Sequence, residues 1–82
     1  MITVILYTTA GCHLCELAEA MLQDMSSQHD IKIVATEIGD NDELVARYGI
    51  KIPVIRFLDG SELNWPFEAH EILTKISQLV AN

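Results

Sequence analysis

Basic residues are scarce in this sequence, and their scarcity disfavours one large class of function. Lysine and arginine together number 5 among 82 residues, against 12 aspartates and glutamates, which gives a formal net charge of -7. A surface of that sign repels the phosphate backbone of DNA or RNA. We therefore expect no nucleic-acid partner.

Long apolar runs are also missing. No stretch approaches the roughly 20 apolar residues of a membrane-spanning helix, and residues 1–7 lack the basic segment of a secretory signal. We expect a cytoplasmic protein with no membrane partner. The chain is also short for more than one core, so we expect a single domain over residues 1–82.

Cysteine is too rare for a disulfide-dense secreted scaffold, since the chain has only 2, while 50% of its residues are hydrophobic. Apolar patterning must therefore supply the fold. Continuous apolar runs predict strands, and repeats every three or four residues predict helices. Strands are expected at 2–7, 31–35, 50–58 and 61–63, and helices at 12–25, 44–48 and 69–80. This βαβαββα order opens with a βαβ unit, whose two strands should be parallel with a right-handed crossover.

The first predicted helix has a wide apolar face. Its members recur at helical spacing and are expected to pack on the sheet: Leu14, Leu17, Ala18, Met21, Leu22 and Met25. Opposite them stand charged and amide side chains. The helix should therefore lie on the protein surface with one side buried.

Cys12 and Cys15 form a C-x-x-C pair at the expected start of this helix. Cys12 lies where free backbone N–H groups and the helix dipole stabilise a thiolate, whereas Cys15 is one turn further in. Such an asymmetric pair suits thiol–disulfide exchange, in which one thiolate attacks and the second thiol resolves the mixed disulfide.

Two alternatives compete for the cysteine pair. A closed zinc site needs four ligands, and the remaining soft candidates, His13, His29 and His70, fall on different predicted elements, so no metal is expected. A purely structural disulfide is the other alternative. Both are disfavoured against redox chemistry.

The chain resembles the thioredoxin fold over nearly its whole length, on the C-x-x-C at a helix start and Ile52-Pro53 at the opening of a hairpin. Residues 7–15 and 49–54 make it similar to the small bacterial glutaredoxin-like family. The resemblance implies an α/β fold with a four-stranded mixed sheet flanked by three helices. It also implies that Cys12 is the nucleophile and Cys15 the resolving thiol, that Pro53 is a cis-proline facing the thiols, and that the Ile52 backbone pairs with a bound thiol peptide.

Three other residues are candidates for contact with substrate. His13 can lower the pKa of Cys12 or simply face solvent, and Tyr7 can bind substrate or close the strand end. Trp65 can cover a groove beside the thiols, although anchoring of the last helix is the favoured interpretation.

Two features of the sequence depart from the pattern that the resemblance implies for glutathione binding. The dipeptide between the cysteines is His13-Leu14 rather than the proline-containing one common in glutaredoxins, and the glycine-rich turn expected before the last helix is absent. The resemblance places Arg47 and Lys51 near the position from which a basic residue of a glutaredoxin reaches a glutathione carboxylate, with ordinary surface charge as the alternative. We expect no tightly bound cofactor and leave glutathione open as the reductant.

The sequence thus predicts a monomeric thiol–disulfide oxidoreductase of cell redox homeostasis. The protein would act through Cys12 and Cys15, and its substrates would be disulfide-containing proteins or small-molecule thiols. The competing hypothesis is a binding module, or a carrier of a shared iron–sulfur cluster or metal, on the same fold.

Overall fold

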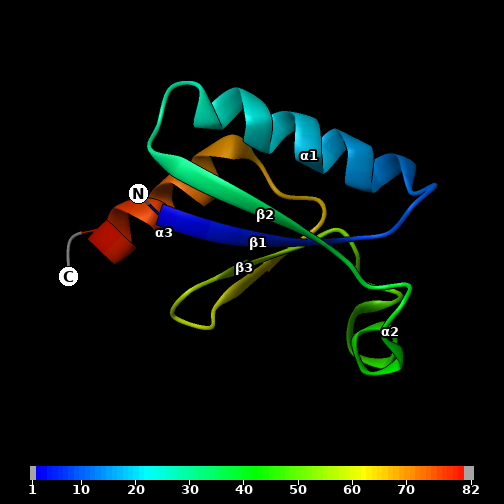
Figure 1. Ribbon diagram of the computed structural model, residues 1–82. Coiled ribbons are helices and arrows are strands. Elements are labelled where there is room, and N and C mark those ends of the chain that lie inside the picture. The colour runs from blue at the N-terminus through cyan, green and yellow to red at the C-terminus, as the bar shows by residue number, and fades with distance from the viewer. Residues whose placement is uncertain (1, 81–82) are drawn as a thin grey trace.

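A computed structural model describes residues 2–80 of the chain (Figure 1). Its elements are β1 (Ile2–Thr8), α1 (His13–Ser26), β2 (Ile31–Glu37), α2 (Asp42–Tyr48), β3 (Val54–Phe57), β4 (Glu62–Asn64) and α3 (Ala69–Val80). This order confirms the predicted βαβαββα succession. Across these described residues, no helix is both long and apolar enough to cross a membrane.

The four strands form one mixed sheet in the order β2-β1-β3-β4. β1 runs parallel to β2, in a register that extends from Ile2 opposite Ile31 to Thr8 opposite Glu37. β3 is antiparallel to both of its neighbours. Because parallel neighbours require a long crossover, α1 connects the first pair across one face of the sheet. The arrangement is the predicted four-stranded mixed sheet with three helices.

The face of the sheet under α1 and α3 carries the larger core. Alternate residues of a strand point to opposite faces, and on β1 Val4 and Leu6 are those that point here. The buried members of this core are Val4, Leu6, Ala18, Leu22, Met25, Ile31, Ile55, Phe57, Phe67 and Ile72. The buried side chains on this face therefore stabilise it by apolar packing.

The opposite face carries a smaller core under α2, which lies away from α1 and α3 at one end of the sheet in Figure 1. Its buried members are Tyr7, Ile38, Tyr48 and Val54. The Tyr7 and Tyr48 rings stack with centroids 4.3 Å apart, and the Tyr48 hydroxyl donates to Glu62 Oε2 at 2.5 Å. This hydrogen bond raises the pKa of Tyr48, with burial adding to the effect.

The buried side of α1 is displaced from the prediction. Leu14 and Leu17 are each 44% exposed, whereas Cys15 is 2% exposed and belongs to the buried set with Ala18, Leu22 and Met25. The prediction was wrong for the two leucines because the apolar arc of the helix is wider than the strip that contacts the sheet. Leu14 and Leu17 lie at the rim of that arc.

The third strand is shorter than the predicted 50–58. Pairing begins at Val54, directly after Pro53, and Ile50 is fully exposed in the preceding loop. There the N–H groups of Lys51 and Ile52 both donate to the Tyr48 carbonyl, at 2.8 and 3.1 Å. Those turn bonds continue α2 instead of opening a strand, so the alternation of isoleucines here was misleading.

Candidate active site

A short loop carries the chain from β1 to the cysteine pair. Gly11 has a φ of +79°, a left-handed conformation that favours glycine, and this turn directs the chain into α1. Cys12 follows as the N-cap residue of α1, with an extended backbone whose φ is -91° and ψ is 106°. The predicted helix start is thus confirmed, with Cys12 just before the first helical residue.

The two cysteines are joined as a disulfide across the first turn of α1, with their Cα atoms 5.2 Å apart. Cys12 Sγ also accepts a hydrogen bond from the Cys15 N–H at 3.1 Å. Cys12 is half-buried while Cys15 is 2% exposed, so Cys12 is the more accessible sulfur. N–H groups at a helix start stabilise a thiolate in the reduced form.

His13 lies on the protein surface. Its side chain is 79% exposed, and Nδ1 lies 3.6 Å from Glu16 Oε2, which is itself on the surface. This placement favours the interpretation in which His13 faces solvent.

Pro53 lies in the turn between α2 and β3, and the Ile52–Pro53 bond is cis, as predicted. The Pro53 side chain is fully buried and Ile52 is half-buried. The Pro53 carbonyl accepts from the Trp65 N–H at 3.2 Å. The proline turn is therefore attached directly to the segment that follows β4.

Trp65 lies half-buried beside that turn. Its ring meets Phe67 edge to face at 5.2 Å and packs against the larger core, and the Trp65–Pro66 bond is a second cis bond that the sequence analysis did not predict. These contacts favour anchoring of the segment before α3. Trp65 is not fully buried, and its backbone N–H is bonded to the Pro53 carbonyl.

Tyr7 is buried rather than open to a ligand. It is 6% exposed and stacked on Tyr48, and a hydrogen bond with its side chain raises the pKa of Arg56. These contacts favour the interpretation in which Tyr7 closes the strand end.

Glu37 is the notable residue that sequence reasoning missed. From the end of β2 its carboxylate accepts hydrogen bonds from Thr9 Oγ1 at 2.6 Å, the Ala10 N–H at 2.9 Å and the Gly39 N–H at 2.7 Å. The Thr9 hydroxyl is the largest cause that lowers the pKa of this carboxyl, followed by the Gly39 amide. The loop before Cys12 is thereby tied to the loop after β2.

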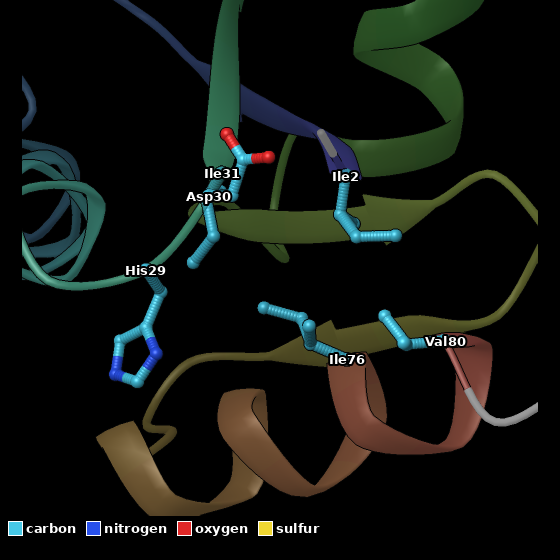
Figure 2. A pocket seen from close by; sticks show the side chains of 6 residues that line it. All are labelled: Ile2, His29, Asp30, Ile31, Ile76 and Val80. Atoms are coloured by element: carbon cyan, nitrogen blue, oxygen red, sulfur yellow. The ribbon is translucent and has the colours of Figure 1, made fainter.

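The three histidines stay apart. His70 Nδ1 is 3.2 Å from Glu68 Oε2, and His29 borders a pocket formed with Ile2, Asp30, Ile31, Ile76 and Val80 (Figure 2). Ile2 begins β1, so this pocket lies at the opposite end of the strand from the cysteine loop. Residues 2–80 contain no group of three or more His, Cys, Asp or Glu side chains arranged to hold a metal ion.

Comparisons with known proteins agree with this geometry. A family model described as Glutaredoxin-like domain (DUF836) matches residues 3–77. A solved protein from X. campestris is similar with 31% identity and a TM-score of 0.80, covering 92% of this chain and 96% of that one. A protein from Nitrosomonas europaea shares 24% identity with a TM-score of 0.78, over 90% and 89% of the two chains.

More distant likeness shows the fold alone. Thioredoxin 1 from Thermosipho africanus is 17% identical, with a TM-score of 0.72 over 96% of this chain and 94% of that one. A search of curated proteins found no match. The predicted thioredoxin fold is confirmed.

Proposed function

The chain belongs to the glutaredoxin-like domain family, and from that premise we propose that it is a thiol–disulfide oxidoreductase acting through Cys12 and Cys15. The observation that carries the proposal is the disulfide at the start of α1, in which one sulfur is accessible and its partner is 2% exposed. An accessible sulfur at a helix N-terminus suits a nucleophile, and a buried neighbour within bonding reach suits a resolving thiol.

The reaction proceeds in two exchange steps from the reduced protein. The Cys12 thiolate attacks one sulfur of the substrate disulfide, and the other substrate sulfur leaves as a thiolate that takes a proton. Cys15, after losing its proton, then attacks the Cys12 sulfur and releases the second substrate thiol. The protein is oxidised by two electrons and the substrate is reduced by two.

Substrate is held, in this proposal, by the residues around the proline turn. The Ile52 N–H is already bonded to the Tyr48 carbonyl, so it is the Ile52 carbonyl, next to the cis bond, that accepts from an extended segment of the substrate. The accessible part of Trp65 covers that segment. The bond from the Trp65 N–H to the Pro53 carbonyl supports this assignment because it holds the two together. His13 and Tyr7 take no direct part.

The reaction requires a thiol reductant and no resident cofactor. Glutathione is one candidate, but it is net anionic and the chain carries a net charge of -7, so a dithiol protein is the other. We propose that the protein is a monomer in the cytoplasm, where thiols are kept reduced and disulfides are usually transient.

The test follows reduction of a peptide–glutathione mixed disulfide, with glutathione or thioredoxin reductase as the electron source. Cys12→Ser is expected to abolish turnover, and Cys15→Ser is expected to trap a mixed disulfide at Cys12 when the substrate is a protein disulfide. A visible absorption spectrum of the purified protein is the companion measurement. Full activity in Cys12→Ser, or a stoichiometric metal cluster together with no exchange activity, would contradict the proposal.

A further inference from the structure

The loop that delivers Cys12 has little packing of its own. Ala10 and Gly11 are exposed, and nothing lies within 4 Å of the position that a Cβ on Gly11 would occupy. The turn bond from the Cys12 N–H to the Thr9 carbonyl is long, at 3.4 Å. Apolar burial therefore cannot be what holds this loop in place.

Glu37 supplies the missing restraint with both of its carboxylate oxygens. Oε1 accepts from the Ala10 N–H, and Oε2 accepts from the Thr9 hydroxyl and the Gly39 N–H. Its backbone is fixed by the parallel register that pairs Glu37 with Thr8. Gly39 fits the arrangement closely, since a Cβ there would lie 2.8 Å from Glu37 Oε2.

We propose that Glu37 is a positioning residue of the dithiol, which holds the loop of Thr9 and Ala10 so that Cys12 Sγ stays at the N-terminus of α1. There the helix N–H groups stabilise the thiolate. The proposal rests on the proposed function for its biological purpose, whereas its physical content concerns only the reactivity of Cys12. The hydrogen-bond partners of Glu37 are Thr9, Ala10 and Gly39 rather than the cysteine sulfurs, so Glu37 acts on Cys12 through the loop.

The chemistry of the contact makes the carboxylate hard to replace. All three partners donate a hydrogen bond to the carboxylate, and two of them are backbone N–H groups, which can donate but cannot accept. A glutamine has one acceptor oxygen and one NH2 group, so one backbone N–H would face another donor whichever way the amide turns. An aspartate keeps the charge but is one methylene too short.

The experiment measures alkylation of reduced Cys12 by iodoacetamide as a function of pH, with Cys15→Ser as the parent protein. Glu37→Gln and Glu37→Asp are expected to slow the reaction about three- to tenfold at pH 7, because less thiolate is stabilised. Glu19→Gln removes the same charge from the exposed side of α1 and is the matched control, expected to react as the parent does.

Thr9 gives an independent pair of variants that leaves the carboxylate in place. Thr9→Val removes the hydroxyl that donates to Glu37 and is expected to slow alkylation, while Thr9→Ser keeps the hydroxyl and should restore the parent rate. In the protein with both cysteines, equilibration with dithiothreitol is expected to shift about three- to tenfold toward the disulfide in Glu37→Gln, since the reduced form loses stabilisation.

A purely structural role is separated by thermal unfolding. If Glu37→Gln and Thr9→Val melt earlier but alkylate at the parent rate, the positioning role is overturned. If Glu37→Asp reacts as the parent does, the charge and not the hydrogen bonding matters, and the proposal is also overturned. If the wild-type protein reduces no disulfide substrate while these variants still change Cys12 reactivity, the proposed function fails and the positioning role stands.

Discussion

The two faces of the sheet are stabilised by different physics. Under α1 and α3, the buried set contains only apolar side chains, including Leu22 and Ile72 at 0% exposure. Under α2, two of the four buried residues are tyrosines, whose rings stack while one hydroxyl reaches the exposed Glu62. Arg47 adds a cation 5.4 Å from the centre of the Tyr48 ring.

The difference concerns how much each face depends on particular partners. An apolar core tolerates exchange of one aliphatic side chain for another of similar volume, because its interactions are not directional. A stacked and hydrogen-bonded pair is directional, so removal of one atom changes it. The larger face should therefore lose most from lost volume, and the smaller face from a lost hydrogen bond.

Leu22→Ala is expected to have the largest effect on stability. Leu22 is fully buried between α1 and the sheet, so the truncation should lower the free energy of unfolding by about 2–5 kcal/mol. Leu17→Ala on the same helix is the matched control and should cost far less, because Leu17 is 44% exposed. Denaturant unfolding measures both, and equal losses would mean that the two leucines share one environment.

Tyr48→Phe is expected to have an intermediate effect. It keeps the ring stack but removes the hydrogen bond to Glu62. The loss should lower the free energy of unfolding by about 1–2 kcal/mol, because the acceptor is charged but the exposed carboxylate can bond to water instead. A double-mutant cycle with Glu62→Gln isolates this contact from other effects of each change. A coupling energy near zero would show that the hydrogen bond does not stabilise the smaller face.

Alkaline titration sharpens the same contrast. The pKa of Tyr48 is raised above its ordinary value of 10.0, chiefly by the hydrogen bond to Glu62. The folded state thus holds this proton more tightly than the unfolded state, so its contribution to stability is present below pH 10 and is lost as the pH rises further. Ultraviolet titration of a Tyr7→Phe variant follows Tyr48 alone, and adding Glu62→Gln should move the transition to lower pH.

Asp59→Asn is expected to have the smallest effect. This carboxylate in the turn after β3 accepts from the Ser61 hydroxyl at 2.6 Å and pairs with Lys75 at 2.9 Å, and these contacts lower its pKa. Its contribution is therefore present above the ordinary pKa and lost as the pH falls below it. The groups are exposed enough for water to screen them, so melting should shift only slightly at pH 7 and not at all in strong acid. A shift that grows on acidification would contradict this sign.

Sequence patterning predicted the order of the elements because apolar periodicity is a local property. It did not place Leu14 and Leu17 correctly, since the side of α1 that meets the sheet depends on how the whole helix is seated. Ile50 was wrongly predicted to begin the third strand for a related reason. Its alternation with Ile52 has the period of a strand, but the carbonyl of Tyr48 holds this segment in a turn.

The candidate site divides in the same way. Cys12 and Cys15 were predictable because three positions on a helix start bring them together whatever the rest of the chain does. Glu37 was not, because its bond to the Ala10 N–H spans 27 positions and two of its three partners are backbone N–H groups, which leave no side-chain pattern. Parallel strands bring such residues together at their carboxyl ends, and an acidic residue at the end of the second strand was the available clue.

The strand order also determines when each part of the site can form during synthesis. β1 lies between β2 and β3 in the sheet, and it pairs with β3 in an antiparallel register that sets Val4 opposite Phe57. A growing chain that has reached the end of β2 already contains the cysteine pair, the crossover helix and Glu37, but one edge of β1 is still unpaired. The proline turn is synthesised together with β3, the strand that pairs with that edge, so the cysteine pair is made before the turn that we propose holds substrate.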